Sequence, residues 1–454
     1  MTARFRPPTW SLAALTVTGL IALTGCAPGS SSDAPAAKSP SDVSTDVAKA
    51  GKVTLTVWDA ENGEGTNPVV TSLNKAFEAK YPNVTVKRTT RDFANLKTTL
   101  KLALSSNNPP DVVEVNQGYP DMGAFVKAGL NQPLDGYSKV YDWTSRIPET
   151  ARELDSFSTD GSQIGTGKLY GVPQIGSLVS FYYNKQKLSS HGLTPPKSWD
   201  DLLAAMDKIK SDGDTPLWFG NQDKYEAIGL FATILDSKMA AGDVRDLVYG
   251  RKGSWDSPEV VAAAQEIVDW TKKGYLTSGA NGLAGGQALS DFSKGKGVFY
   301  LDGDWDSATL GKSMGGNVGM FLPPAADGAT HAAEGGQGGA WAITSKSTHA
   351  DVAAAYINFL TNQDAEQQLS QKGNLPIVDS DAVPPKAGTV TADVYDAWHT
   401  VNQDGGITPY LDYATPTFYD TLTANLQNLI GGKLSPKDFA SALQDDHSKF
   451  TGAE

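Results

Sequence analysis

Residues 53–87 read VTLTVWDAENGEGTNPVVTSLNKAFEAKYPNVTVK and give the clearest indication of the fold. The segment opens with β-branched and aromatic residues at 53–58 and continues with turn-forming residues at 59–65. Apolar side chains then recur at helical spacing over 69–80, and a second β-branched run occupies 84–87. This order predicts a strand, a loop, a helix and a second strand.

Strand-like and helix-like segments continue to alternate along the chain. They are a helix at 93–104, a strand at 110–115, amphipathic helices at 199–210 and 257–273, a strand at 341–344 and a long helix at 350–371. Such alternation predicts an α/β fold with a parallel sheet that helices cover on both faces. A chain of 454 residues exceeds the size at which one hydrophobic core stops growing, so we expect two α/β lobes.

The first 25 residues have the order of an export signal. Arg4 and Arg6 give a positive start, residues 10–24 carry no charge, and the segment closes on Leu-Thr-Gly-Cys at 23–26. The uncharged stretch is shorter than the roughly 20 residues that cross a bilayer as a helix. We therefore expect residues 1–25 to be a signal peptide that is removed.

The only cysteine of the chain, Cys26, stands directly after this export segment. LTGC resembles the bacterial lipobox, and the resemblance implies that Cys26 becomes a lipidated N-terminus on the outer face of the cell membrane. Residues 27–50 are rich in Ser, Ala, Pro and Asp and contain almost no large apolar side chain. We expect 26–51 to be a flexible tether because such a composition cannot bury enough surface to become ordered.

Composition argues against several classes of function. The formal charge of −13 argues against a nucleic-acid partner, and a single cysteine excludes a disulfide framework or a thiolate metal cluster. The five histidines do not stand at metal-binding spacing, and neither a Gly-x-Ser-x-Gly motif nor a phosphate-binding loop occurs. We therefore predict no cofactor, no bound metal and no catalytic residue.

Several segments, in chain order, resemble the extracellular sugar-binding proteins of ABC importers, the family that includes maltose-binding protein. They are NPPDVVEV at 108–115, YGVPQIGSLVSFYYNKQKLSSHGLTPPKSWDDLLAAMDKIK at 170–210, KGKGVFYLDGDWDSATL at 294–310 and GGAWAITSKSTHADVAAAYINFLTNQDAEQQL at 338–369. In the second segment Ser198 replaces the commoner Thr and keeps a hydroxyl that can cap the next helix.

The resemblance implies a periplasmic-binding-protein-like fold with the ligand in a cleft between two α/β lobes. By analogy, three hinge crossings join the lobes near 172–177, 318–323 and 374–378. Lobe 1 would comprise 52–173 and 322–375, and lobe 2 would comprise 174–321 and 376–454. The implied function is to capture a sugar, in particular a short oligosaccharide, as a monomer and to present it to the permease of an ABC importer.

Sugars present hydroxyl groups at their edges and C–H patches on their faces, so a sugar site combines aromatic platforms with Asp, Glu, Asn and Gln. In α/β sheets, ligands bind at the loops beyond the carboxyl ends of the strands. The loops at 59–66 and 116–120 hold that position and supply the candidates Glu61, Asn62, Asn116, Gln117 and Tyr119. Each of these residues could instead only form a turn or a cap.

Further candidates come from the resemblance. Trp305 stands where relatives commonly stack a tryptophan on a sugar ring, although a buried core tryptophan is the alternative. Gln174 and Ser177 match ligand-facing positions, but relatives often carry a carboxylate at the second of these. The remaining candidates are Asn221, Gln222, Tyr225, Asp304, Gln337, Trp341, Tyr410 and Tyr413. Trp341 could line the cleft or pack beneath it.

Two other classes of function remain open. A lipid-anchored glycoside hydrolase would also combine Trp with paired carboxylates, but spacing along the chain does not establish such a pair. A two-lobed binder of a peptide, polyamine or metal would share the fold. A cation binder would call for a carboxylate-lined cleft without Asn, Gln and Trp.

Overall fold

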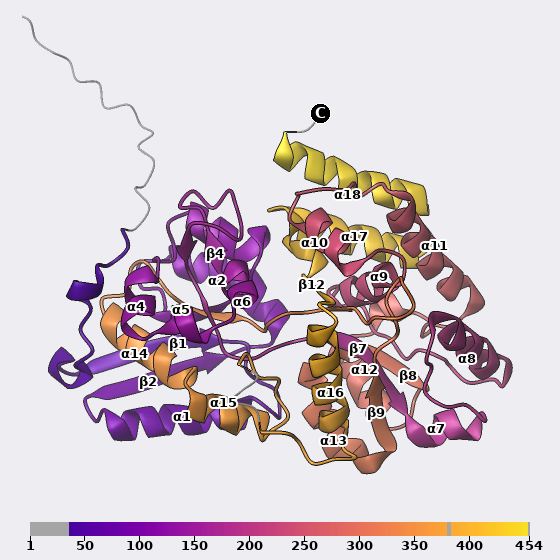
Figure 1. The fold of residues 1–454 in the computed structure, drawn as a ribbon, viewed down its shortest axis with the longest axis horizontal. Helices are drawn as coiled ribbons and strands as arrows, with labels where there is room; N and C mark the ends of the chain where they lie inside the picture. Colours follow the sequence, from indigo (N-terminus) through magenta and orange to yellow (C-terminus); the bar gives the residue numbers. More distant parts are fainter. Residues whose placement is uncertain (1–35, 379–382, 453–454) are drawn as a thin grey trace, which may run out of the picture. The chain divides into compact units, whose positions relative to one another are not determined.

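Two separate β-sheets organise the residues that the computed structural model describes, namely 36–378 and 383–452 (Figure 1). The first sheet has the strand order β2-β1-β3-β11-β6, with β1 Val53–Asp59, β2 Val84–Thr90, β3 Val112–Val115, β6 Val172–Pro173 and β11 Ala340–Ile343. The second has the order β8-β7-β9, with β7 Val179–Asn184, β8 Phe299–Gly303 and β9 Val318–Phe321. We call the elements around the first sheet lobe 1 and those around the second lobe 2.

Helices cover both faces of the lobe 1 sheet, which confirms the prediction from the alternating pattern. On one face α1 (Asn67–Lys80) and α14 (Ala350–Leu360) bring Phe77 and Tyr356 edge to face, with ring centroids 5.3 Å apart. On the other face Leu96, Leu100 and Leu104 of α2 (Phe93–Ser105) pack with Val113. Orange α14 and α15 thus pack against indigo α1 although they lie far apart in the sequence (Figure 1).

The remaining helices are short in lobe 1 and longer in lobe 2. Lobe 1 also holds α3 Ala124–Lys127, α4 Asp135–Val140, α5 Trp143–Arg146, α6 Glu149–Leu154 and α15 Gln363–Ser370. Lobe 2 holds α7 Lys185–Ser190, α8 Trp199–Ser211, α9 Glu226–Asp236, α10 Ala241–Val248, α11 Pro258–Lys273, α12 Gly285–Ser293, α13 Ser307–Met314, α16 Val390–Gln403, α17 Phe418–Ile430 and α18 Pro436–Thr451.

Helix α9 is the central helix of lobe 2. Every residue from Glu226 to Asp236 is buried, as expected for a helix that is apolar nearly all round. Phe231 of this helix meets Phe439 of α18 edge to face, with ring centroids 5.1 Å apart. The helix therefore fixes the position of Glu226, which lies at its first turn.

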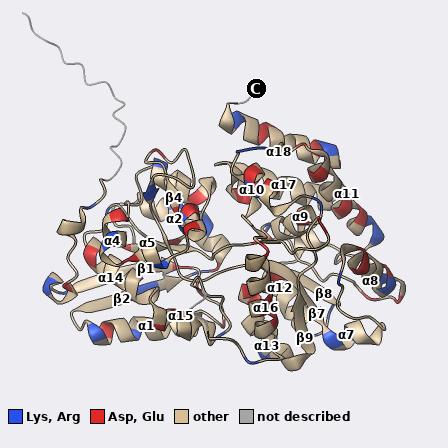
Figure 2. Ribbon diagram, viewed as in Figure 1, with Lys and Arg blue, Asp and Glu red and all other residues tan. Residues whose placement is uncertain are grey.

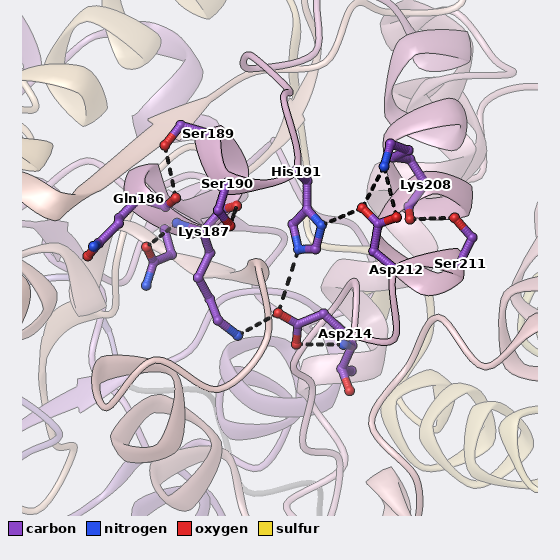
Figure 3. A network of polar contacts seen from close by, with 11 residues as sticks. Gln186, Lys187, Ser189, Ser190, His191, Lys208, Ser211, Asp212 and Asp214 are labelled. Carbon is purple, nitrogen blue, oxygen red and sulfur yellow. Dashed lines mark hydrogen bonds and ion pairs between the residues drawn. The ribbon is translucent and has the colours of Figure 1, made fainter.

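The outer helices of lobe 2 carry mixed charges. Along α8 and α11, Asp and Glu begin at the first turn and Lys side chains gather in the last turn (Figure 2). Between α7 and the end of α8, His191 Nδ1 lies 2.8 Å from Asp212 Oδ2, and Lys187 Nζ lies 2.8 Å from Asp214 Oδ2 (Figure 3). Such surface pairs hold local geometry and contribute little net stability, because solvent screens them.

Two predicted elements differ in detail. The predicted parallel sheet holds only for β1, β2 and β3. In lobe 1, β11 pairs antiparallel with β3 and β6, and in lobe 2, β7 pairs antiparallel with β8 and β9. The predicted helix at 350–371 is two helices, because Asn362 ends the first and caps the second by accepting a hydrogen bond from Ala365 N at 2.9 Å. Periodicity alone did not show this break, since the apolar pattern continues through it.

The predicted second crossing at 318–323 is wrong in position. Residues 318–321 form β9, and β10 (Ala333–Glu334) still pairs with β12 (Ile407–Thr408), which packs beside α10 in lobe 2. The chain joins the five-stranded sheet only at β11, so it changes lobes between β10 and β11. Both stretches contain Gly, so glycine content did not distinguish them. The divisions at 173/174 and 375/376 remain predictions.

The predicted tether, 26–51, is corrected at its end, because residues 36–51 pack against lobe 1. Lys38 Nζ lies 2.5 Å from Asp351 Oδ1, and Val47 is buried. Asn83 Nδ2 donates to the carbonyl oxygens of Val47 and Gly51, both at 2.8 Å. Polar contacts and the small apolar side chains of Val43 and Val47 hold this segment, which contains no large apolar residue, and this is why its composition suggested a tether.

The export segment 1–25, Cys26 and the rest of the predicted tether lie outside the described residues. Within the described ranges, no helix is both long enough and apolar enough to cross a membrane.

Candidate functional site

A cavity of about 740 Å³ lies between elements of lobe 1 and lobe 2. Lobe 1 contributes the loop that follows β1, the first turn of α2 and the end of β3. Lobe 2 contributes the end of β8, the first turns of α9 and α13, and side chains from the segment around α17. This volume is typical of a pocket for a small-molecule ligand.

Two aromatic side chains are exposed in the cavity. Trp305 is 40% exposed and Phe93 is 37% exposed, and both belong to its lining. Phe93 of α2 meets Tyr225 of lobe 2 edge to face, with ring centroids 6.0 Å apart. Half-exposed aromatic faces in a cavity are suited to stack on a flat apolar surface of a ligand.

Carboxyl groups dominate the polar lining of the cavity. Among the described residues, ten acidic side chains and one basic side chain, Lys372, line it. The acidic ones are Glu61, Asp92, Glu114, Asp223, Glu226, Asp302, Asp304, Asp306, Glu334 and Asp412.

On the lobe 1 side, Glu61 follows β1 and Glu114 belongs to β3. Burial raises the pKa of Glu61 to about 7, with Asp59 adding to the rise. Arg88 opposes it and donates two hydrogen bonds of 2.7 Å to Asp59. Burial, and then the charge of Glu61, raise the pKa of Glu114, which accepts a hydrogen bond from Ala60 N at 2.6 Å.

On the lobe 2 side, the hydroxyl group of Tyr300 lies 2.9 Å from Asp302 Oδ2 and 2.8 Å from Asp306 Oδ2. Burial raises the pKa of Asp302 to about 6, and burial followed by the charge of Asp302 raises that of Asp306. Glu226 is only 5% exposed, and neither of its carboxyl oxygens accepts a hydrogen bond. Burial, and then the charge of Asp302, raise its pKa to about 9.

A third group of polar side chains lies where β6 leads into β7. Asp304 accepts hydrogen bonds from Ser177 Oγ and Leu178 N, both at 3.1 Å, and burial raises its pKa to about 7. Ser177 Oγ also lies 2.8 Å from the hydroxyl group of Tyr410. Burial likewise raises the pKa of Asp412 to about 6, although Lys97 opposes the rise.

The structure brings nine of the predicted site residues into the cavity lining. They are Glu61, Asn62, Asn116, Ser177, Tyr225, Asp304, Trp305, Gln337 and Tyr410. Seven others do not line it: Gln117, Tyr119, Gln174, Asn221, Gln222, Trp341 and Tyr413.

Most of those seven are engaged inside the protein. Trp341 Nε1 donates to Gln174 Oε1 at 3.1 Å, so each satisfies the other in the lobe 1 core. Tyr413 donates to Gln117 Oε1 at 2.9 Å, beneath the cavity wall.

The remaining three of the seven are also placed elsewhere. Asn221 accepts a hydrogen bond from Ala227 N at 3.2 Å in the buried start of α9. Tyr119 packs against Phe157, and Gln222 is exposed outside the cavity.

Sequence reasoning missed several lining residues, namely Asp92, Phe93, Asn95, Glu114, Asp223, Glu226, Tyr300, Asp302, Asp306, Glu334, Asp412 and Tyr419. One signal could have found the first three. They follow β2, whose carboxyl end lies at the same sheet edge as that of β1, because the two strands are parallel.

The carboxyl groups do not form a metal site. Within the part of the chain that the structure describes, no three or more His, Cys, Asp or Glu side chains are grouped so that they could hold a metal ion. The acids are instead spread over the wall of the cavity, beside its aromatic side chains.

Comparisons with known proteins agree with this architecture. The profile of a family described as bacterial extracellular solute-binding protein matches residues 62–367. An uncharacterised ABC transporter extracellular-binding protein of Pyrococcus horikoshii is 23% identical over 78% of this chain and 77% of its own length. The melibiose/raffinose/stachyose-binding protein of Bacillus subtilis is 22% identical over 89% of this chain and 91% of its own length.

Among solved structures, a chitin oligosaccharide binding protein superimposes with a TM-score of 0.77 at 21% identity. The match covers 88% of this chain and 100% of that protein. A raffinose complex of another solute-binding protein superimposes with a TM-score of 0.70 at 18% identity, over 88% of this chain. At such identities the likeness shows the fold, which is that of two-lobed binding proteins.

Proposed function

Because the chain belongs to the family of bacterial extracellular solute-binding proteins, we propose that it captures a carbohydrate in its cavity and delivers it to the permease of an ABC importer. The observation that carries this proposal is the cavity itself, in which the half-exposed rings of Trp305 and Phe93 lie among many hydrogen-bond acceptors. A ring with apolar faces and hydroxyl groups at its edge fits such a lining.

Relatives support a sugar in particular. The Bacillus subtilis relative is named for melibiose, raffinose and stachyose, and a relative from Streptococcus mutans is named a multiple sugar-binding protein. The latter is 22% identical over 85% of this chain. These relatives are binding proteins rather than enzymes, so we propose that this chain binds its ligand without transforming it.

A thermal-shift screen against mono-, di- and trisaccharides tests the proposal. A ligand at 100 times its dissociation constant should add about 2.7 kcal/mol to the free energy of unfolding. Failure of every carbohydrate to raise the unfolding midpoint contradicts the proposal. Shorter products after incubation with an oligosaccharide would instead indicate a glycoside hydrolase.

We further propose that the chain is a lipoprotein anchored outside the cell through Cys26. The support is the order of the sequence, in which an uncharged export segment ends on Leu-Thr-Gly before this cysteine.

We also propose that ligand binding closes the two lobes and that the importer recognises the closed monomer. The chain passes from the first sheet to the second between β6 and β7 and returns between β9 and β11, and lobes joined by so few segments can move as a hinge. Small-angle scattering should show a smaller radius of gyration with ligand than without it. An unchanged radius at saturation speaks against a hinge.

A further inference from the structure

We propose that the carbohydrate carries a protonated amine, and that the carboxyl groups around Glu226 bind that amine. This inference rests on the proposed function, because it names the class of sugar that the same cavity takes. It is carried by one wall of the cavity, which Asp223 and Glu226 form together with Asp302 and Asp306.

Glu226 is the key side chain of this wall. It is 5% exposed and lines the cavity, and apart from the neighbouring carboxyl group of Asp223 nothing in the described protein is placed to satisfy its carboxyl oxygens. Buried polar groups in proteins are nearly always hydrogen-bonded, since an unsatisfied one is costly. A ligand that donates hydrogen bonds to Glu226 would remove that cost.

The neighbours of Glu226 are themselves acidic. Asp223 accepts a hydrogen bond from Gly285 N at 2.9 Å. The hydroxyl group of Tyr300 lies within hydrogen-bond distance of both Asp302 and Asp306. Among the described residues, no Lys or Arg forms an ion pair with any of these four acids. The wall therefore concentrates carboxyl groups without a cation of its own.

Elsewhere in the cavity region the protein supplies the cation itself. Asp59 is fully buried, and Arg88 pairs with it through two hydrogen bonds of 2.7 Å. The contrast between Asp59 and Glu226 indicates that the counter-charge of the lobe 2 wall comes from the ligand. Burial and mutual repulsion raise the pKa values of Glu226 and Asp306, as expected when acids are crowded without a cation.

An ammonium group fits this wall chemically. It is a compact charge with three donors and no acceptor, so it can serve several carboxyl groups at once, and charge-assisted hydrogen bonds are the strongest of their kind. A divalent metal ion fits less well, because the described acids are not grouped as metal ligands.

The aromatic side chains distinguish an amino sugar from a simple polyamine. Trp305 stands between Asp304 and Asp306 in the chain, and its ring is half exposed in the cavity. A ligand that satisfies both features needs an amine next to a ring with an apolar face, whereas an alkyl polyamine offers no such face. A sugar ring that bears an amine has both.

Calorimetry with matched ligands tests the inference. The β-1,4-linked glucose disaccharide can be compared in three forms that carry an amine, an acetamide or a hydroxyl group at C2 of each ring. Glucose, galactose and mannose can be compared with their 2-amino forms in the same way. At pH 7 we expect the amine form to bind at least tenfold more tightly than its matched neutral forms.

Glu226→Gln should remove most of this preference, because the amide keeps the shape of the side chain but loses its charge. In this variant the ratio of the affinity for the amine form to that for its matched neutral form should fall below threefold. Asp236→Asn is the matched control, since Asp236 is a buried acid of the same helix that does not line the cavity. This variant should keep the full preference for the amine.

The outcomes separate this inference from the proposed function. If neutral sugars bind as tightly as their amine forms, or if Glu226→Gln keeps the preference, the inference is wrong while the proposed function stands. If no carbohydrate binds in any form, the proposed function fails as well. Binding of a diamine such as putrescine in that case would identify a polyamine binder.

Discussion

The indole ring of Trp305 lies directly against the backbone of Gly303, so that a Cβ atom at residue 303 would stand 2.2 Å from two of its ring carbons. That distance is far below a normal contact, so any side chain at residue 303 would displace the ring. Glycine at this position therefore gives Trp305 a flat support, on which one face of the indole can remain open to the cavity.

Trp305→Ala should weaken ligand binding at least tenfold, which corresponds to about 1.4 kcal/mol. The ring contributes both stacking and contact area to a sugar face. Because the side chain is 40% exposed, the unfolding midpoint of the unliganded protein should hardly change. Calorimetry and thermal unfolding measure the two quantities.

Trp341→Ala is the matched comparison. Trp341 is 1% exposed and its Nε1 donates to Gln174 Oε1 within the lobe 1 core. Truncation of such a core aromatic typically costs about 3–5 kcal/mol of unfolding free energy. Equal loss of stability in both variants, with binding retained in Trp305→Ala, would show that Trp305 is a core residue as well.

The sequence predicted the part of the site that follows from strand order. Glu61 and Asn62 follow β1, and they line the cavity because parallel strands bring their carboxyl ends to one edge. Trp305 was predicted from a resemblance, and it also lies in the lining. The helix and strand alternation likewise predicted the lobe 1 sheet between its two layers of helices.

Which of the other side chains line the cavity depends on the direction in which each one points, and no local sequence pattern determines that direction. Gln174 was predicted to face the ligand and Trp341 either to line the cleft or to pack beneath it, and the two side chains hydrogen-bond each other in the core. Glu226 stands beside the predicted Tyr225, yet only the packing of α9 shows that its carboxyl group lines the cavity. The antiparallel order of the lobe 2 sheet is set by long connections, so the alternating pattern did not reveal it.

The unliganded protein should become less stable as the pH rises from 6.5 to 9. Burial raises the pKa values of Glu61 and Asp304 to about 7 and that of Glu226 to about 9. A carboxyl group whose pKa is higher in the folded than in the unfolded protein stabilises the fold while it is protonated. This contribution is complete below the pKa of the unfolded state, about 4, and is lost as the pH rises through the pKa of the folded state.

Thermal unfolding measured between pH 6.5 and 9 checks the direction of this change in stability. Burial lowers the pKa of His447, which has an ordinary value of 6.5, so that group acts below the chosen window. A hydrogen bond from Ser158 lowers the pKa of Asp160 to about 2, so the ionisation of Asp160 affects stability only in acid. An unfolding midpoint that stays flat or rises between pH 6.5 and 9 contradicts the prediction.

Asp351→Ala should release residues 36–51 from lobe 1. Its carboxylate accepts hydrogen bonds from Lys38 Nζ at 2.5 Å, Ser44 N at 3.2 Å and the Tyr137 hydroxyl at 3.1 Å. Amide hydrogen exchange should become faster in 38–50, while ligand affinity should stay unchanged because none of these residues lines the cavity.

Lys49→Ala is the control for this variant. Lys49 pairs only with Asp46 at the exposed surface, so its loss should leave exchange in the segment nearly unchanged. Unaltered exchange in Asp351→Ala would mean that the buried Val47 and the hydrogen bonds from Asn83 hold the segment without the Asp351 carboxylate.

Cys26→Ser should move the protein from the membrane fraction to the soluble fraction, since serine cannot form the thioether that carries the lipid. Fractionation followed by a salt wash measures the distribution. If the variant stays with the membrane after the wash, the export segment itself is retained as the anchor, and the lipobox interpretation fails.

Binding of an amine-bearing sugar should release protons near neutral pH. Glu226, Asp302 and Asp306 line this wall, and burial together with mutual repulsion raises the pKa values of Glu226 and Asp306, while burial raises that of Asp302. An ammonium group beside them favours the ionised form, so their pKa values fall on binding and protons leave. Affinity for the amine should therefore rise as the pH increases from 5.5 to 7.5.

Titration calorimetry in two buffers of different ionisation enthalpy counts the protons directly. The matched neutral sugar is the control, because a hydroxyl group does not stabilise a carboxylate as a cation does, and its affinity should be nearly independent of pH. Glu226→Gln should release fewer protons than the unmodified protein when the amine binds, since the largest contributor has been removed. Equal proton release in the two proteins would place the amine at another group of acids in the cavity, such as Glu61 and Glu114, rather than at the lobe 2 wall.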